Sequence, residues 1–173
     1  MLLIDETGMM LQPVVRRTWA PRGQTPGMYC WDRHDRLSVL GGLSLAPRAA
    51  RLGLYFRGHG QNMTAPGLET LLRNVRPQLR RPLTIVLDRW SVHRKTAKSL
   101  EADRRFEFEW RPACAPDLNP VEYVWNRTKY TDLANYVPED VIELECAVDC
   151  CLQTTRKAPE LLRSFFHAAE LEL

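Results

Sequence analysis

The feature that most constrains the fold of this chain is a continuous apolar run, Pro82 to Asp88, with the sequence Pro-Leu-Thr-Ile-Val-Leu-Asp. An uninterrupted run of this length is typical of a strand that is buried on both faces of its sheet. Such strands lie inside α/β proteins, where helices cover both faces of the sheet. The run therefore predicts an α/β fold with Asp88 at the carboxyl end of a central strand.

The remaining segments predict a mixed sheet with helices on its faces. Three β-rich runs precede the central strand and one follows it, at 2–7, 36–45, 51–57 and 106–110. Helical spacing of apolar residues, capping residues and prolines predict five helices, over 64–79, 95–104, 119–130, 138–156 and 159–171. The order is β-β-β-α-β-α-β-α-α-α, without a repeat or a linker. We expect a single domain over residues 1–173, since this length supports one core.

Charge bears on the choice of partner. The chain has 24 Lys and Arg against 21 Asp and Glu, a net charge of +3, which is too small to indicate a nucleic-acid partner alone. Most of the basic residues are arginines, whose guanidinium group pairs with two phosphate oxygens at once. A GC-rich coding bias explains the arginines equally well, so composition leaves this partner open.

Cysteine usage and hydropathy bear on localisation. The five cysteines are an odd number without framework spacing, which indicates a reducing compartment. Cys146 and Cys150 are four residues apart on a predicted helix but lack a second ligand pair for zinc, so we interpret them as small buried residues. The apolar run Leu2-Leu3-Ile4 stops at Asp5, too early for a signal peptide, and no segment could span a membrane. We expect a soluble cytoplasmic protein.

Three acidic residues are candidates for chemistry, and each also has a structural alternative. Asp88 ends the buried strand, where it could bind a metal or cap the next helix. Asp5 follows three aliphatic residues in a strand, and either it or Glu6 must face the opposite side of the sheet. Glu122 is the third residue of a predicted helix, where it could cap Asn119 reciprocally. Taken together, Asp5, Asp88 and Glu122 suggest a carboxylate cluster that binds Mg²⁺ or Mn²⁺.

The surrounding motifs carry a family resemblance. They are Ile-Asp-Glu-Thr-Gly at 4–8, Trp-Ala-Pro-Arg-Gly-Gln-Thr-Pro at 19–26, Val-Leu-Asp at 86–88 with His93, and Ala-Pro-Asp-Leu-Asn-Pro-Val-Glu at 115–122 with Trp125 and Lys129. In this order they resemble the mariner-like group of bacterial insertion-sequence transposases, within the DDE endonuclease superfamily. The resemblance runs from about Leu3 to Asn135. Glu122 follows Asp88 by 34 residues, which also resembles the short interval of that group.

The resemblance implies a ribonuclease H-like fold, with Asp5, Asp88 and Glu122 as catalytic metal ligands. It also implies a reaction: nicking at transposon ends, followed by attack of the freed 3′-hydroxyl on target DNA, commonly at a TA dinucleotide. Two Mg²⁺ or Mn²⁺ ions suit this chemistry, because a metal pair activates the nucleophile and stabilises the leaving oxygen. The implied partners are transposon-end DNA, target DNA and a second copy of the chain as a homodimer.

Further residues are candidate DNA contacts. His93 matches the family's histidine after the second aspartate, where it could orient a phosphate or the metal site, or simply start a helix. Lys129 lies seven residues beyond Glu122, on the same predicted helix face, and could hold a phosphate. Arg17, Arg22 and Arg94 are plausible contacts to the DNA backbone, whereas we expect Trp125 to pack in the core.

The chain also departs from the family pattern. Arg89 stands where the family often has asparagine, so a cation lies beside a proposed metal ligand. Family members carry helix-turn-helix modules before the first aspartate, and here Asp5 is almost at the start. The chain is then one product of a split reading frame, a truncated relic or a piece of a longer protein. We expect the transposon ends to be recognised outside it, in the first case by a separate N-terminal polypeptide. Two other functions are alternatives. An inactive remnant would bind DNA without cleaving it. A metal-free glycosidase with two carboxylates would keep its activity in the presence of a chelator.

Overall fold

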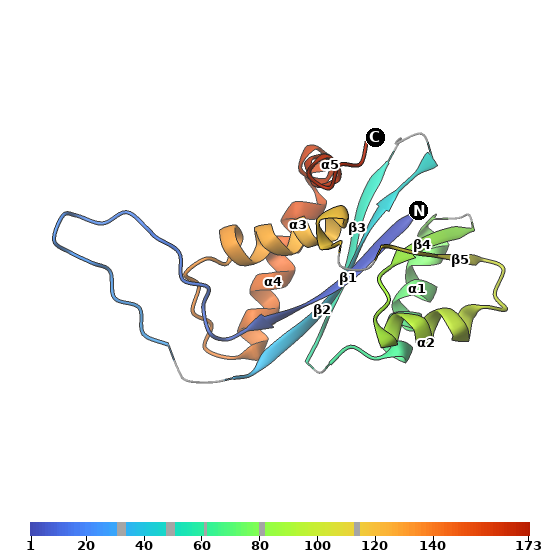
Figure 1. Ribbon diagram of the computed structural model, residues 1–173. Helices are drawn as coiled ribbons and strands as arrows, with labels where there is room; N and C mark the ends of the chain where they lie inside the picture. Colours follow the sequence, from blue (N-terminus) through green and yellow to red (C-terminus); the bar gives the residue numbers. More distant parts are fainter. Residues whose placement is uncertain (31–33, 48–50, 61, 80–81, 113–114) are drawn as a thin grey trace.

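A computed structural model describes residues 1–173 with the exception of 31–33, 48–50, 61, 80–81 and 113–114. Its centre is a mixed sheet of five strands in the order β3-β2-β1-β4-β5 (Figure 1). β1 pairs antiparallel with β2 and parallel with β4, β2 pairs antiparallel with β3, and β4 pairs parallel with β5. The strands are β1 (Leu2–Met10), β2 (Arg36–Leu45), β3 (Leu52–His59), β4 (Leu83–Leu87) and β5 (Phe106–Trp110).

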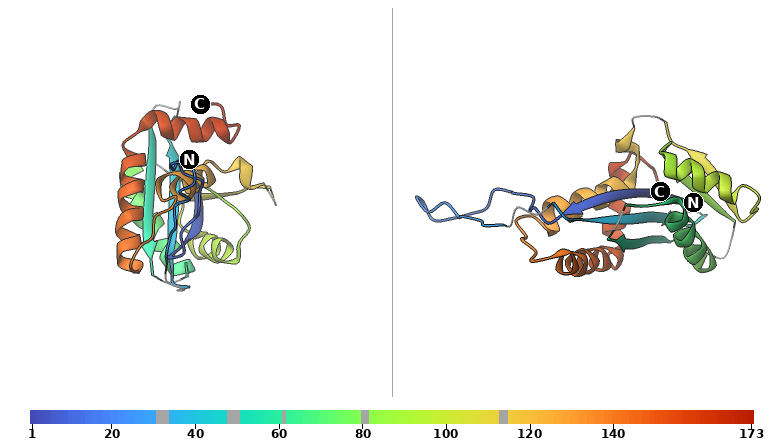
Figure 2. Two further views of the ribbon diagram at one scale, coloured as in Figure 1. Left: turned by 90° about the vertical axis from the view of Figure 1, so that its left-hand side faces the viewer. Right: turned by 90° about the horizontal axis from the view of Figure 1, so that it is seen from below.

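Helices cover both faces of the sheet (Figure 2). One face packs against α1 (Ala65–Leu79) and α2 (Ser91–Leu100), in a core that includes Leu2, Ile4 and Leu72. The other packs against α3 (Pro120–Arg127), α4 (Val141–Arg156) and α5 (Pro159–Ala168), in a core that includes Leu3 and Trp125. The predicted α/β class, a ribonuclease H-like mixed sheet flanked by helices, is confirmed. Among the described residues, no helix is long and apolar enough to cross a bilayer.

Strand β1 distributes its residues between the two cores. Successive side chains on a strand point to opposite faces, so Leu3 and Asp5 share one face while Ile4 and Glu6 share the other. Leu3 belongs to the core with α3, and Ile4 belongs to the core with α1 and α2. Asp5 and Glu6 therefore face opposite sides of the sheet, as expected from their adjacent positions in the strand.

The parallel pairing of β1 with β4 brings two of the candidate acids to neighbouring strands. In this pair, Leu2 is opposite Ile85 and Leu3 is opposite Val86. Asp5 on β1 and Asp88 after β4 therefore lie near the same edge of the sheet. β5 continues this edge, because the backbone N–H of Arg111 donates to the Leu87 carbonyl at 2.8 Å. Three strand segments therefore deliver side chains to one place, as expected at the carboxyl ends of parallel strands.

Several boundaries differ from the expected ones, including those of α2, β1 and α3. α2 begins at Ser91 rather than at residue 95, so His93 and Arg94 lie in its first turn. β1 continues to Met10 because it pairs with β2 along its whole length. The helix that starts at Pro120 becomes a π-helix from Thr128 to Asp132, a form that often occurs at functional sites.

The burial expected for two cysteines is wrong. Cys146 and Cys150 are exposed on α4, which packs on the sheet through Leu144, Val148 and Leu152 instead. These three leucine and valine positions recur every four residues, so they form one face of the helix. The cysteines follow the same four-residue spacing on a different face, and spacing alone does not say which face is buried.

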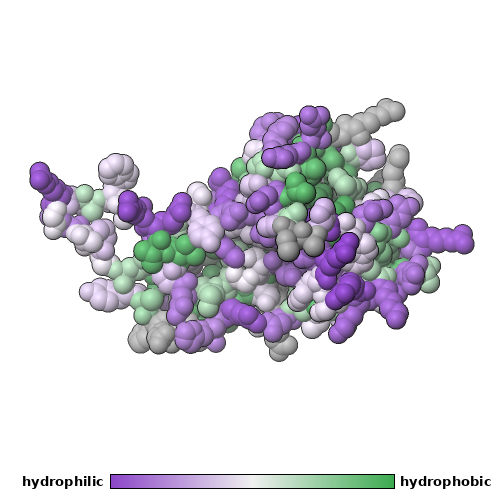
Figure 3. Space-filling view, in the orientation of Figure 1, coloured by the Kyte–Doolittle hydropathy of each residue, from purple (hydrophilic) through white to green (hydrophobic). Residues whose placement is uncertain are grey.

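A long loop between β1 and β2, called the arm below and described over residues 12–30 and 34–35, projects from the body (Figure 1). Its surface mixes hydrophilic and hydrophobic residues (Figure 3), and Trp19 is fully exposed. The arm turns at Gly23, whose φ of 82° is the left-handed conformation that glycine adopts without strain. The Gln24 N–H donates to the Pro21 carbonyl at 3.0 Å and closes this turn.

Candidate active site

The three candidate acids line one cavity. It has a volume of about 270 Å³ and lies beside the carboxyl ends of β4 and β5. Its lining consists of Asp5, Asp88, Arg89, Arg111, Pro112, Ala115, Pro116 and Glu122. The acids come from a strand, a strand end and a helix start, which are far apart in the sequence, so tertiary folding assembles this group.

Asp5 is the most buried of the three acids, with 6% of its surface exposed. The indole N–H of Trp125 donates to Asp5 Oδ2 at 3.0 Å, and Nη2 of Arg111 lies 3.9 Å from Oδ1. Burial raises the pKa of Asp5 to about 8, with further raising contributions from Glu122 and Glu6 that Arg111 and Trp125 oppose. Asp5 and Glu122 line the same cavity, and repulsion between two such carboxylates is relieved by a bound cation.

Asp88 is held by a histidine. His93 Nδ1 lies 2.5 Å from Asp88 Oδ1, and the Trp90 N–H donates to the same oxygen at 2.9 Å. Desolvation of Asp88 opposes these contacts, which together lower its pKa. The cap alternative is not realised, because Trp90 is the cap residue of α2 and no side chain in the described part of the chain caps the helix; Asp88 closes the turn before it. Its carboxylate also lines the cavity, so the turn and the metal role are compatible.

His93 lies between the carboxylates of Asp88 and Glu6. It is fully buried, and its Nε2 lies 3.1 Å from Glu6 Oε2 without hydrogen-bond geometry. Desolvation lowers the pKa of His93, but Glu6 and Asp88 outweigh it, and the net shift is upward. The DNA contact expected of His93 does not fit its burial, because neither ring nitrogen faces solvent. Its position fits the other expectation, that it orients the metal site through Asp88.

Glu122 lies in the first turn of α3 and does not cap it. The Asn119 N–H, which Glu122 would receive in a capping box, donates instead to the Pro116 carbonyl at 2.8 Å. The Glu122 carboxylate lines the cavity with Asp5 and Asp88, which is the arrangement expected of a metal ligand. The reciprocal cap therefore loses its support, and the predicted start of the helix at Asn119 and Pro120 is confirmed.

Arg111 is a cavity residue that the sequence reasoning missed. It is 8% exposed and follows β5 directly, so it enters the site from the same edge as Asp88. A buried cation needs a partner, and Asp5 is one of its partners. Only its position after the short strand could have indicated this, since Arg is common throughout the chain.

Lys129 does not line the acidic cavity but lies at another cavity, beside Met9 and Tyr130. It is half-buried, and burial lowers its pKa while Glu122 and Asp5 act in the opposite direction. Trp125 packs in the core as expected, 2% exposed. The other candidate contacts are exposed: Arg17 and Arg22 on the arm, and Arg94 on α2. These three do not line the acidic cavity, and their contact with DNA stays a prediction.

The donor set fits a divalent metal ion. Mg²⁺ and Mn²⁺ prefer oxygen ligands, and three carboxylates share one cavity here. Within the described part of the chain, no three acidic, histidine or cysteine side chains converge closely enough to hold an ion as they stand. Asp5 is engaged by Trp125, and Asp88 by His93, so at least one carboxylate must turn to share an ion.

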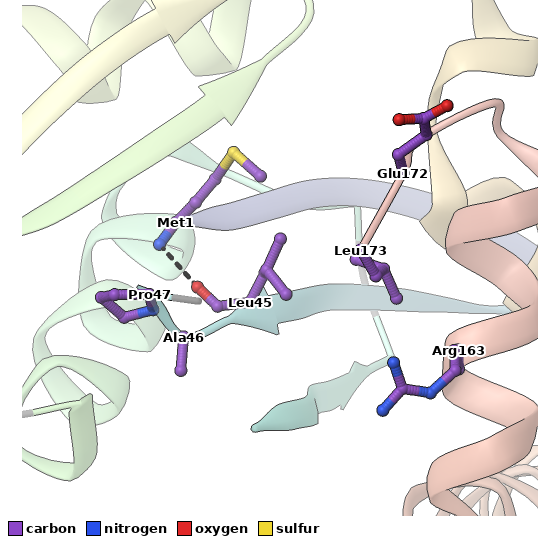
Figure 4. A pocket seen from close by; sticks show the side chains of 7 residues that line it. All are labelled: Met1, Leu45, Ala46, Pro47, Arg163, Glu172 and Leu173. Carbon is purple, nitrogen blue, oxygen red and sulfur yellow. Dashed lines mark hydrogen bonds between the residues drawn. The ribbon is translucent and has the colours of Figure 1, made fainter. Parts of the chain in front are cut away.

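A second cavity, of about 710 Å³, lies elsewhere and lacks this chemistry. It is formed where the two chain ends meet the end of β2 (Figure 4), and the Met1 amine donates to the Leu45 carbonyl at 3.0 Å. Arg163 and Glu172 are its only charged side chains among the described residues. It is larger than the acidic cavity, but one carboxylate offers no metal cluster, so it is not the candidate site.

Comparison with known proteins agrees with the site. A family model described as DDE superfamily endonuclease matches residues 1–145, which include all three acids. This match covers most of the chain, and the chain therefore belongs to the DDE superfamily of endonucleases. No curated protein gives a significant match.

Solved structures of one transposase share the fold. The chain is similar to Mos1 transposase in a paired-end complex with the left transposon end, with a TM-score of 0.69, 16% identity and coverage of 97% of this chain and 51% of that chain. It is also similar to the Mos1 mariner paired-end complex with Mn, with a TM-score of 0.69, 16% identity and coverage of 98% and 53%. The chain thus spans about half the length of these relatives.

Proposed function

We propose that this chain is the catalytic domain of a DDE transposase, which cleaves DNA strands at transposon ends and joins them to target DNA. The observation that carries the proposal is the common cavity of Asp5, Asp88 and Glu122 in a member of this endonuclease superfamily. The similar Mos1 structures are complexes with a transposon end or with Mn, which supports DNA and a divalent metal as partners here.

Asp5, Asp88 and Glu122 would hold the metal, and two Mg²⁺ or Mn²⁺ ions suit the reaction. Bound metal supplies an activated nucleophile and stabilises the charge of the leaving oxygen. His93 fixes the orientation of Asp88, and Trp125 fixes that of Asp5. The remaining parts of the proposal are a TA target, a homodimer, recognition of the ends by a separate N-terminal polypeptide, and a cytoplasmic location where thiols stay reduced.

Plasmid cleavage tests the proposal. The full chain is incubated with supercoiled plasmid and Mn²⁺, and nicked and linear products are measured. We expect cleavage that EDTA abolishes and that Asp88→Asn lowers at least a hundredfold, because the substitution removes a ligand charge with little change of shape. Asp117→Asn is the matched control, since Asp117 is exposed outside the cavity.

The outcomes separate the alternatives. Cleavage by Asp88→Asn at the wild-type rate would exclude the proposed site. DNA binding without cleavage, under conditions where the wild-type protein is folded and Mn²⁺ is in excess, would favour the inactive remnant. Cleavage that survives EDTA would point to a metal-free hydrolase instead.

DNA binding by this chain is expected to depend on charge rather than on sequence. Contacts from Arg17, Arg22, Arg94 and Lys129 to phosphates would position DNA without specifying it. We expect weak binding that falls steeply with salt and differs little between duplexes. Competition binding measures this, and a thousandfold preference for one duplex would show that the ends are recognised here.

A further inference from the structure

Arg111 is an unusual cation for a site that binds metal ions. Its side chain is 91% buried, and it lies in the cavity of the three acids. Burying a guanidinium group is unfavourable unless opposite charge and hydrogen-bond acceptors surround it. The neighbours of Arg111 therefore indicate what it does.

Two neighbours hold the guanidinium group. Nη2 lies 3.9 Å from Asp5 Oδ1. Asn119, which is fully buried, has an amide that can face either way. In one orientation its oxygen accepts a 3.3 Å hydrogen bond from Val121 N, and in the other it accepts from Arg111 Nη1 at 2.9 Å and Nη2 at 3.1 Å. We favour the second orientation, since it gives two shorter bonds to a buried charge.

These contacts do not satisfy every donor of the Arg111 guanidinium group. Its Nε is buried and has no hydrogen-bond partner in the described structure. Asp5 is 3.9 Å away, beyond hydrogen-bond distance, so the pair attracts without locking. The backbone, by contrast, is fixed, because the Arg111 N–H continues the ladder between β4 and β5. The side chain is thus a cation on a fixed backbone, with an Nε–H that is unbonded among the described residues, beside the buried carboxylate of Asp5.

We infer that Arg111 is a built-in counter-cation, which stabilises the negative charge of Asp5 in the metal-free protein and competes with a divalent ion for that carboxylate. The inference rests on the proposed function only in that the competing ion is the divalent metal. Two cations a few ångströms apart in a partly buried site repel strongly, since the effective dielectric constant there is far below that of water. A metal ion therefore binds Asp5 only against the repulsion of Arg111 or by displacing its side chain. Arg111 thus lowers the affinity of the site for the metal ion.

Metal binding without DNA tests the inference. Free Mn²⁺ is measured by electron paramagnetic resonance during titration of the full-length wild-type chain and its variants. We expect Arg111→Leu to lower the Kd for Mn²⁺ at least tenfold. Arg163→Leu makes the same charge change on α5, with a side chain 41% exposed, and should leave the Kd within twofold. An unchanged or raised Kd in Arg111→Leu would overturn the inference.

A metal-free measurement tests the ion pair directly. In EDTA at about pH 9, where Asp5 is ionised, Arg111→Leu should lower the midpoint of thermal unfolding more than Arg163→Leu, because the Asp5 carboxylate loses its counter-cation. Adding Asp5→Asn should recover part of that loss, since the remaining group is neutral. Strictly additive effects of the two substitutions would exclude the pairing. Should Arg111→Leu fail to fold, Arg111→Gln removes the charge while keeping polar atoms, and the same Kd and coupling are expected of it.

The outcomes distinguish this inference from the proposed function. Binding of Mn²⁺ that Asp88→Asn abolishes, with an equal Kd in wild type and Arg111→Leu, refutes the inference alone. An absence of Mn²⁺ binding in both proteins refutes both. If Arg111 were instead a phosphate ligand, Arg111→Leu would weaken DNA binding in EDTA without tightening Mn²⁺, and that result also overturns the inference.

Discussion

The indole N–H of Trp125 donates a 3.0 Å hydrogen bond to Asp5 Oδ2, joining α3 to the first strand across 120 residues of sequence. Both residues are almost fully buried. The bond fixes the carboxylate that the metal site requires, and it gives a core tryptophan a polar function. Substitutions of Trp125 and of the residues around it measure what these contacts contribute to stability.

Trp125→Phe should destabilise the protein, because it leaves a buried carboxylate without its donor and removes ring atoms from the core. A lost bond to a charged group costs about 1.5–3 kcal/mol, and the cavity adds to this. Urea unfolding measures the change. Trp19→Phe serves as the control, since Trp19 is fully exposed, and should stay within about 0.5 kcal/mol of wild type. Equal effects of the two substitutions would contradict the prediction.

Gly41→Ala should destabilise the protein for a steric reason. Gly41 is opposite Asp5 in the β1–β2 register, and an added Cβ would lie 2.5 Å from Trp125 Cη2 and 2.7 Å from Cζ2. Overpacking of this kind costs about 1–3 kcal/mol. Gly8→Ala on β1 meets nothing within 4 Å and is the matched control. The Gly41→Ala and Trp125→Phe effects should fall short of additivity, because phenylalanine withdraws the clashing ring; full additivity would argue against the contact.

His93→Gln should lower metal-dependent cleavage about 10- to 100-fold, as is typical when a residue that orients a metal ligand is lost. The substitution removes the ring nitrogen that lies 2.5 Å from Asp88, so the carboxylate is free to turn. Cleavage rates at increasing Mn²⁺ measure the effect, and higher Mn²⁺ should restore part of the activity. His167→Gln on α5 is exposed and should leave cleavage unchanged. A wild-type rate in His93→Gln would remove His93 from the site.

Glu143 should make stability depend on acid pH. Its carboxylate accepts from the Glu139 N–H and the Tyr136 hydroxyl, and these bonds lower its pKa. Because the pKa of Glu143 is lowered by folding, its carboxylate stabilises the protein fully above the unfolded-state pKa of about 4.3. This stabilisation is lost as pH falls through the folded-state pKa. Thermal unfolding from pH 6 to about pH 3 should therefore show a smaller decline in Glu143→Gln than in wild type. Glu160→Gln, with a 90% exposed side chain, should decline as wild type does.

Asn135 should control how firmly the arm is attached. Its Oδ1 accepts from the Arg16 N–H at 2.8 Å, and its N–H donates to the Val14 carbonyl at 2.9 Å. Its φ of 60° is left-handed, which asparagine tolerates and alanine does not. Asn135→Ala should speed tryptic cleavage after Arg16 and Arg17, measured by mass spectrometry. Asn135→Gly keeps the conformation but loses Oδ1, so an intermediate rate is expected; equal rates in all three proteins would contradict this attachment.

Much of this protein follows from local sequence. The run at 82–88 identifies the central strand because its apolar residues have no polar face to expose. Asn119 followed by Pro120 identifies the start of α3 because these residue types are common at the first positions of a helix. The family motifs identify Asp5, Asp88 and Glu122 as candidates, since the motifs and their spacing can be read without knowledge of the fold. These features are determined by residues within a few positions of one another.

Other properties depend on residues that meet only in the folded chain. Neither the bond from Trp125 to Asp5 nor the burial of Arg111 beside that carboxylate is visible in sequence, because each joins segments separated by a hundred residues or more. The start of α2 at Ser91 depends on the turn that Asp88 closes with Trp90. The exposure of Cys146 depends on which face of α4 meets the sheet. The sequence determined which acids could bind a metal, and only tertiary packing decided their partners, because burial sets the energy of every charge in the site.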